Sequence, residues 1–187
     1  MAVIKTNVEG VLIIEPQVFG DERGYFFESY NEERFRAETG IETHFVQDNE
    51  SKSKYGVVRG MHFQRQPHAQ AKLVRVVRGR VIDVAVDIRS GSPTYGKYVA
   101  VELSESNHRQ LFIPKGFAHG YVVMEDDTVF QYKCDEYYHP ESEGGIAWND
   151  PTIGIDWGIN NGDIILSTKD QHNPTLAELG EIFSYGE

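Results

Sequence analysis

The stretch KLVRVVRGRVIDVAVDI, residues 72–88, reads as two β-strands that meet at a glycine. Side chains alternate between the two faces of a strand, so Lys72, Val74 and Val76 share one face of the first strand. In the second strand, the even-numbered apolar residues from 82 to 88 share a face, and Asp83 lies on the other. We therefore predict a tight hairpin at Gly79 and a lysine that points inward beside two valines.

Further short runs rich in Val, Ile, Phe and Tyr, the residues that strands favour, are separated by turn residues. They span residues 11–14, 25–30, 43–47, 57–62, 98–103, 110–113, 120–124 and 128–133. Short strands at this spacing predict an all-β sandwich, barrel or jelly roll. A few short peripheral helices are expected, one capped by Asn31 and ended by Gly40, another running from Thr175 to Gly180.

The chain has 187 residues, of which 40% are apolar and 25% charged, and a formal net charge of -11. This size and composition predict one globular domain over residues 1–187. No cluster of basic residues suits nucleic acid, and no apolar run approaches the roughly 20 residues that span a bilayer. The single cysteine, Cys134, excludes a disulfide within the chain, and the first residues lack the apolar core of a signal peptide. We therefore expect a cytoplasmic protein.

The segment VVRGMHFQ, residues 57–64, places a cation and an imidazole in one short strand. The planar fork of arginine suits a phosphate, and histidine suits proton transfer near neutral pH. Strict alternation puts Arg59 and His62 on opposite faces, and a β-bulge at Gly60 would bring them to one space. The pair indicates an enzyme for a phosphorylated substrate with a labile proton. The structural alternative is a surface arginine beside a buried, hydrogen-bonded histidine.

Chemistry at a C–H bond next to a carbonyl needs a base, a group that stabilises the enolate oxygen, and an acid that returns a proton. We interpret His62 as the base, Lys72 as the oxyanion partner and Tyr132 as the acid. Asp170 could orient the imidazole and stabilise its charged form. The alternatives are a packed strand aromatic for Tyr132 and a loop or helix-cap residue for Asp170.

Two further segments offer groups that can hold a nucleotide. In the segment DERGYFFE, residues 21–28, Arg23 can clamp a phosphate, and Phe26 or Phe27 can stack on a base. Glu28 can accept a hydrogen bond from a pyrimidine N–H. The alternative is an ordinary edge strand. In the segment VQDN, residues 46–49, the amides can contact a sugar or base, and the alternative is a strand that ends in a turn.

The segment IPKGFAHG, residues 113–120, presents His119 at the start of a strand. Its Pro-x-Gly-x-x-His spacing resembles the second motif of the cupin superfamily, whose fold is a small β-barrel. In metal-dependent cupins this histidine is a metal ligand, together with a His-x-His pair and a glutamate. Here Gln64 stands where the second histidine of the pair belongs, and His68 lies too far along. Because a metal usually needs three protein ligands, we expect no metal and interpret His119 as a substrate-binding or dyad residue.

Together these segments resemble the dTDP-4-dehydrorhamnose 3,5-epimerase family. The matching segments, in the family's order and spacing, are DERGYF (21–26), QDN (47–49), VRGMH (58–62), Gly79 with DVAVD (83–87), IPKGFAHG (113–120), YKC (132–134), YHP (138–140), GIAWNDP (145–151) and STKD (167–170). The resemblance implies a cupin-like jelly roll without metal or other cofactor, assembled as a homodimer. It also implies inversion at C3 and C5 of dTDP-4-keto-6-deoxy-D-glucose through enolate intermediates, on the path to dTDP-L-rhamnose.

The resemblance further implies roles for individual residues. His62 is the base, Tyr132 the acid, and Asp170 the partner of His62, while Lys72 lies beside the C4 oxygen. Arg59 and His119 lie near the diphosphate and sugar, and Tyr138 stacks on the thymine. Arg23 and Glu28 reach the nucleotide from the neighbouring subunit, and Phe26 is a further substrate-binding residue. The rest of the pocket is completed by Gln47, Asp48, Asn49, Glu143 and Lys169.

Three other functions remain open. Relatives on the same fold act at C3 or C5 alone, or move the ketone as 3,4-ketoisomerases, and the presence of Tyr132 favours epimerisation. A non-catalytic nucleotide-sugar-binding cupin would keep Arg23, Arg59 and the aromatic residues but could lose the base or the acid. A metal-dependent cupin oxygenase or isomerase would carry stoichiometric metal.

Overall fold

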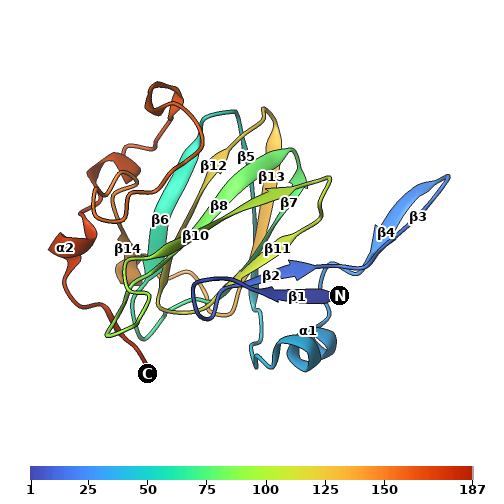
Figure 1. The fold of residues 1–187 in the computed structure, drawn as a ribbon, viewed down its shortest axis with the longest axis horizontal. Helices are drawn as coiled ribbons and strands as arrows, with labels where there is room; N and C mark the ends of the chain where they lie inside the picture. Colours follow the sequence, from blue (N-terminus) through green and yellow to red (C-terminus); the bar gives the residue numbers. More distant parts are fainter. Residues whose placement is uncertain (187) are drawn as a thin grey trace.

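The structure is a computed structural model that describes residues 1–186, and Glu187 of the predicted domain lies outside them. In the described residues, two large antiparallel sheets face each other across a core (Figure 1). The six-stranded sheet contains, in spatial order, β1 (Ala2–Lys5), β2 (Leu12–Glu15), β11 (Gln110–Ile113), β7 (Lys72–Arg78), β13 (Thr128–Cys134) and β5 (Gln47–Ser53). The five-stranded sheet contains β10 (Tyr98–Ser104), β8 (Arg80–Asp87), β12 (Phe117–Val123), β6 (Val58–Gln64) and β14 (Glu143–Gly145).

Smaller elements surround the two sheets. β3 (Val18–Asp21) pairs with β4 (Gly24–Phe27), and β9 (Arg89–Ser90) pairs with β15 (Phe183–Ser184). The helices are α1 (Glu32–Thr39) and α2 (Leu176–Leu179), with short 3-10 turns at η1 (Pro140–Ser142), η2 (Asn161–Asp163) and η3 (Asp170–His172). The prediction of an all-β fold with short peripheral helices is confirmed.

The stretch 72–88 forms two strands as predicted, but the hairpin predicted at Gly79 is wrong. β7 pairs with β11 and β13 in one sheet, whereas β8 pairs with β10 and β12 in the other. Gly79 is the corner at which the chain crosses between the sheets. Its φ of +79° favours glycine, and a Cβ there would lie 2.3 Å from Oγ1 of Thr128. The alternation of side chains predicts two strands and a turn. It does not distinguish a hairpin from two strands that belong to different sheets and face each other across the core.

The space between the sheets is filled by apolar side chains from both of them. Val74 and Val76 of β7 pack in one cluster with Val81 and Ala85 of β8, and each is at most 3% exposed. Burial of each valine contributes about 1.5–3 kcal/mol to stability. Asp83 lies on this inward face of β8, between Val81 and Ala85, as the alternation predicts.

The outer face of the five-stranded sheet is covered as well. Val84 and Val86 of β8 pack with Ile146, Trp157 and Phe183 from the C-terminal part of the chain. This part, drawn from orange to red, lies along β6 and β14 (Figure 1). Because both faces of the sheet are covered at its centre, every residue of β12 is buried.

The predicted helix ends are confirmed. The Asn31 side chain caps the first turn of α1, and Gly40, with φ +71°, ends the helix. Phe35 of α1 packs into an apolar cluster on the outer face of the six-stranded sheet. α2 begins at a capping box formed by Thr175 and Glu178. Within residues 1–186, neither helix is long and apolar enough to cross a membrane.

The strand predictions fail where the sequence is polar. The strand expected over residues 43–47 is wrong, because β5 begins at Gln47 and runs through the polar sequence QDNESKS to Ser53. β5 pairs along its full length with β13 at the edge of the sheet. Pairing with an apolar neighbour, rather than its own composition, makes this segment a strand. β1 and β3 also lie outside the predicted strands.

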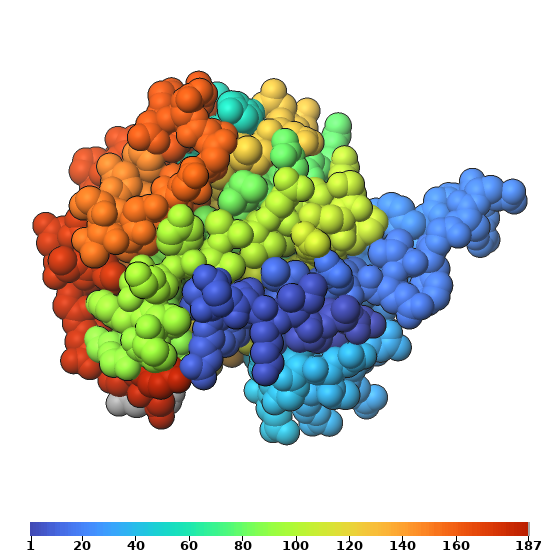
Figure 2. Space-filling view, viewed as in Figure 1, coloured from blue at the N-terminus to red at the C-terminus, as the bar shows by residue number. Residues whose placement is uncertain are grey.

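The hairpin of β3 and β4 projects away from the rest of the molecule (Figures 1 and 2). β4 ends at Phe27, short of the predicted end at residue 30. Phe19, Tyr25 and Phe26 are 56%, 62% and 69% exposed. A two-stranded hairpin is marginally stable by itself, and this one leaves its aromatic side chains uncovered.

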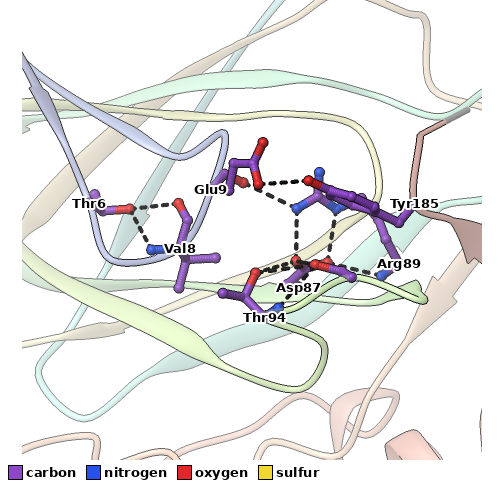
Figure 3. A network of polar contacts seen from close by, with 8 residues as sticks. Thr6, Val8, Glu9, Asp87, Arg89, Thr94 and Tyr185 are labelled. Atoms are coloured by element: carbon purple, nitrogen blue, oxygen red, sulfur yellow. Dashed lines mark hydrogen bonds and ion pairs between the residues drawn. The ribbon is translucent and has the colours of Figure 1, made fainter.

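A buried ion pair fastens both ends of the chain to β8. The Asp87 carboxylate accepts hydrogen bonds from Nε and Nη2 of Arg89 at 2.9 and 2.7 Å and from Oγ1 of Thr94 at 2.7 Å (Figure 3). Arg89 also donates to the carbonyl of Glu9 at 3.1 Å, and the Tyr185 hydroxyl donates to the Glu9 carboxylate at 2.7 Å. Burial alone would raise the pKa of Asp87, but these donors outweigh it and hold the pKa below its usual value.

We expect Asp87→Ala to lower the free energy of unfolding by about 3 kcal/mol or more, because it leaves the mostly buried Arg89 guanidinium without a counter-charge. Urea denaturation measures the loss. The matched control is Glu102→Ala, which removes one carboxylate from the exposed pair with Arg80 and should change stability by less than about 0.5 kcal/mol. Equal losses in the two variants would contradict the role of the buried pair.

Candidate active site

A cavity of about 560 Å³ opens between the two sheets, a size within the range of small-molecule sites. A second cavity of about 330 Å³ adjoins it, and Asn49, His62, Lys72 and Tyr132 line both. His62 comes from the five-stranded sheet, whereas the other three come from the six-stranded sheet. The residues predicted as base and acid therefore face one space from opposite walls.

A β-bulge in β6 brings Arg59 and His62 to the same cavity. His62 pairs with His119 and Arg59 pairs with Tyr121, so two residues of β6 lie opposite one residue of β12. Gly60, with φ +130°, lies in the bulge, and a Cβ there would come within 2.5 Å of the Gly120 Cα. The β-bulge that would bring Arg59 and His62 to one space is thus present at Gly60.

His62 and Asp170 form the predicted pair. Nε2 of His62 lies 2.5 Å from Oδ1 of Asp170, and the Asp170 backbone N–H donates to the Ser167 hydroxyl at 3.1 Å. Burial would raise the pKa of Asp170, but its hydrogen bonds, above all that of His62, hold the pKa below the usual value. Asp170 is thus an acceptor, so Nε2 of His62 carries a proton and Nδ1 is the nitrogen with a free lone pair.

Lys72 and Tyr132 lie together on the facing wall. Nζ of Lys72 is 5.9 Å from the centroid of the Tyr132 ring. Burial lowers the pKa of Lys72, and the nearby acidic groups of Cys134, Asp83 and Glu143 act against that shift. Burial raises the pKa of Tyr132, so its phenol keeps a proton to donate at neutral pH. The inward-pointing lysine predicted from the alternation is confirmed.

A second His–Asp pair lies in the same wall as His62. Nε2 of His119 is 3.0 Å from both carboxylate oxygens of Asp83, and the two side chains are 8% and 0% exposed. Burial lowers the pKa of His119 and raises that of Asp83, while their mutual attraction opposes both shifts. Asp83 is not among the site residues predicted from the sequence. The sequence signal that could have identified Asp83 is a carboxylate on the inward face of an otherwise apolar strand.

Ser51, Ser53 and Tyr121 are further polar groups around the cavity that the sequence analysis missed. Oγ of Ser51 is 2.8 Å from the Tyr121 hydroxyl, and Arg59 donates from Nε and Nη2 to Oγ of Ser53 at 3.2 and 3.1 Å. Burial raises the pKa of Tyr121 to about 12. The two serines follow Asn49 at the period of two along β5, so a strand assigned to this segment would have revealed them.

The second cavity holds several of the predicted binding residues. The Tyr138 hydroxyl donates to the Glu143 carboxylate at 3.0 Å, and the Tyr138 backbone N–H donates to Oε1 of Gln47 at 3.1 Å. Lys169 forms an ion pair with Glu143. Burial would raise the pKa of Glu143, but the hydrogen bonds from Lys169 and Tyr138 lower it. Tyr138 is 51% exposed and presents its ring at the mouth of this cavity.

The structure does not bring every predicted binding residue to the cavities. Asp48 faces away on β5 and pairs with Lys133 at 2.9 Å. Arg23 and Phe26 lie on the projecting hairpin, and Glu28 follows β4, so that all three line surfaces outside both cavities. The prediction of Asp48 in the pocket of its own chain is wrong, because side chains alternate along β5 and Asp48 points away from the face that carries Gln47 and Asn49.

Gln64, at the position of a metal-ligating histidine in other cupins, is committed to the backbone. It is 4% exposed, its Nε2 donates to the carbonyls of His68 and Tyr137 at 2.7 and 3.1 Å, and its Oε1 accepts from the His139 N–H at 2.7 Å. Nε2 of His62 is likewise taken by a carboxylate. Gln64 and His62 therefore form part of the wall of the site and do not form the pair of metal ligands found in metal-dependent cupins.

The family model for dTDP-4-dehydrorhamnose 3,5-epimerase matches residues 5–178. The chain belongs to this epimerase family. The dTDP-4-dehydrorhamnose 3,5-epimerase of Escherichia coli strain K12 is 56% identical to it over 179 residues, which are 96% of each chain. The chain is accordingly an isomerase, as the resemblance implied.

Solved structures of epimerases share the fold. The dTDP-6-deoxy-D-glucose-3,5-epimerase of Legionella pneumophila, in complex with dTDP-4-keto-L-rhamnose, superposes with a TM-score of 0.94 at 48% identity over 100% of this chain and 99% of that one. A 3'-monoepimerase of Streptomyces bikiniensis, in complex with dTDP-quinovose, superposes with a TM-score of 0.89 at 34% identity over 96% and 92% of the chains. The prediction of a cupin-like jelly roll is confirmed.

Proposed function

We propose that this enzyme inverts C3 and C5 of dTDP-4-keto-6-deoxy-D-glucose, as a dTDP-4-dehydrorhamnose 3,5-epimerase. Family membership supports the substrate. The observation that carries the mechanism is the placement of His62 and Tyr132 on opposite walls of one cavity. Inversion removes a proton from one face of a carbon and returns one to the other, so it needs groups on two sides.

His62 begins each inversion by taking the proton from carbon with Nδ1. The C–H electron pair moves into the ring as an enolate, and the C4 carbonyl oxygen gains the negative charge. Asp170 stabilises the imidazolium that forms, as the aspartate does in other His–Asp pairs. Lys72 donates a hydrogen bond to the C4 oxygen from the facing wall.

Tyr132 completes the inversion by giving its phenolic proton to the opposite face of the same carbon. The enolate collapses back to the ketone, and the new C–H bond points the other way. The tyrosinate regains a proton from water and His62 loses its proton to water, so the cycle is balanced without oxidant, reductant or cofactor. C3 and C5 both flank the C4 ketone, so one oxyanion site serves both.

The remaining polar groups suit the nucleotide and the sugar. We assign Arg59 and His119 to the diphosphate and sugar, and Tyr138, at the mouth of the second cavity, to stacking on thymine. Gln47, Asn49, Glu143 and Lys169 lie around the same space and complete the site. The second candidate function is epimerisation at a single carbon, and the similarity to the 3'-monoepimerase is the observation that supports it.

We expect His62→Ala to lower turnover of dTDP-4-keto-6-deoxy-D-glucose by at least about 1,000-fold, because the carbon acid loses its base. Binding of dTDP, measured by calorimetry, should change little. The matched control is His44→Ala, which removes an exposed histidine that pairs with Glu32 outside the site and should leave turnover unchanged. Strong residual activity in His62→Ala would contradict its role.

We also propose that two copies of the chain complete each other's sites. Arg23, Phe26 and Glu28 belong to the projecting hairpin and its base, away from the cavities of their own chain. Exposed aromatic side chains such as those of the hairpin often mark a contact with another protein. In a two-fold dimer, each hairpin would be covered by the partner chain. The hairpin would then reach the partner's nucleotide, with Arg23 on a phosphate, Phe26 on the base and Glu28 on a pyrimidine N–H.

Complementation tests this exchange. Arg23→Ala and His62→Ala dimers should each have low activity at substrate concentrations below the KM. A heterodimer of the two variants, purified through two different tags, should recover about half of the wild-type activity, because one of its sites holds both native groups. An inactive heterodimer would show that Arg23 does not serve the partner's site, and a failure of two copies to associate would contradict the dimer.

A cytoplasmic location completes the proposal. It is supported by the composition, since the single Cys134 is buried and no disulfide within the chain is available to stabilise the fold in an oxidising compartment.

A further inference from the structure

A cluster of ligand-type side chains lies outside the catalytic cavities. His68, Glu136 and His139 each offer one ligand atom, and these atoms all lie within 4.8 Å of one another. His68 belongs to the loop between β6 and β7, whereas the other two follow β13. Across residues 1–186, this is the one group of three His, Cys, Asp or Glu side chains that meets this spacing. His68, which is too far along the sequence for the cupin motif, thus lies beside two other side chains that can bind a metal ion.

The donor set is typical of one class of ion. Two imidazoles and one carboxylate bind Zn²⁺ in proteins, whereas Ca²⁺ and Mg²⁺ prefer oxygen alone. The rings of His68 and His139 are stacked, with centroids 3.5 Å apart and planes at 10°. Their lone pairs lie in the ring planes, so the His68 ring must turn about χ2 to meet His139 at one ion. That torsion is broad in histidine, and both side chains are partly exposed.

Glu141 prepares one of the two histidines for an ion. Its Oε1 lies 3.0 Å from Nδ1 of His139 and accepts a hydrogen bond from Nδ1–H, which leaves Nε2 as the free ligand atom. A carboxylate that holds the far nitrogen of a histidine is a recurring second contact in zinc sites. Glu136 is oriented as well, because its Oε1 accepts the Tyr137 backbone N–H at 2.8 Å.

The two loops that carry the cluster are already fixed to each other. Gln64, buried in β6, bonds to the backbone of His68, Tyr137 and His139. Gln70 donates from Nε2 to the Glu136 carbonyl at 2.8 Å. Because the backbone is ordered by these bonds, an ion would need to order only the side chains, and this favours binding.

We propose that His68, Glu136 and His139 bind a Zn²⁺ ion that joins the β6–β7 loop to the loop after β13. A fourth position remains for water, since the structure supplies three ligand groups. The ion binds the folded chain, in which the two loops meet, and therefore raises the melting temperature. This inference is independent of the catalytic function, because none of the three residues lines the shared cavity.

Calorimetric titration with Zn²⁺ and the thermal melting curve of the full-length protein test the proposal. We expect one Zn²⁺ per chain and a melting temperature that rises with Zn²⁺. His68→Ala and His139→Ala should each weaken binding by more than about 100-fold, and Glu141→Gln by about tenfold, because the first two remove a ligand and the third removes its orienting partner. Circular dichroism confirms that the variants remain folded.

His44→Ala and His62→Ala are the matched controls, one on the surface and one in the cavity, and both should bind Zn²⁺ like the wild type. Unchanged binding in His68→Ala or His139→Ala would overturn the proposal. So would loss of Zn²⁺ in His62→Ala, which would place the ion in the catalytic cavity, or the absence of any saturable binding to the wild type.

Discussion

The contact between Gly60 of β6 and Gly120 of β12 is the constraint on which the site depends. A Cβ on Gly60 would lie 2.5 Å from the Gly120 Cα, and a Cβ on Gly120 would lie 2.9 Å from the Arg59 carbonyl oxygen. Only two glycines allow the backbones this approach. The approach accommodates the extra residue of the bulge, and the bulge turns Arg59 and His62 toward one cavity. A regular strand would send one of them into the apolar layer behind the sheet.

The second feature of this wall of the cavity is that each of its two histidines is paired with a buried carboxylate. Asp170 holds His62, and Asp83 holds His119, each through Nε2 of the imidazole. Burial of an ion pair adds little to stability, because the loss of hydration offsets the attraction. What the pairs do provide is a fixed tautomer for each ring and a fixed place for each proton. Lys72 and Tyr132 face them from a wall where burial lowers one pKa and raises the other.

The parts of the fold that could be predicted from the sequence are those where local pattern and tertiary environment agree. Val74 and Val76 lie two residues apart on one face of β7 and are in the core, and Asn31 and Gly40 bound the helix that they cap. β5 escaped prediction because its polar side chains gain their strand conformation from β13. The hairpin predicted at Gly79 is wrong because a glycine at a sharp turn has the same sequence pattern whether the two strands pair or face each other across the core.

The site shows the same division. His62, Lys72, Tyr132 and Asp170 were selected by chemistry, and the structure brings them to one cavity from four separate segments. Asp83 and the serines of β5 needed contacts that no local pattern contains. Arg23, Phe26 and Glu28 lie apart from the cavity of their own chain, and only the proposed dimer would bring them to a nucleotide.

The most direct measurement of the two-wall mechanism uses Tyr132→Phe with dTDP-4-keto-6-deoxy-D-glucose in deuterium oxide, followed by NMR. The variant keeps the ring and the base but lacks the proton donor. We predict that deuterium still enters next to the ketone, through His62, while formation of the inverted sugar slows by more than about 100-fold. Equal loss of exchange and inversion would contradict the assignment of Tyr132 as the acid on the opposite wall.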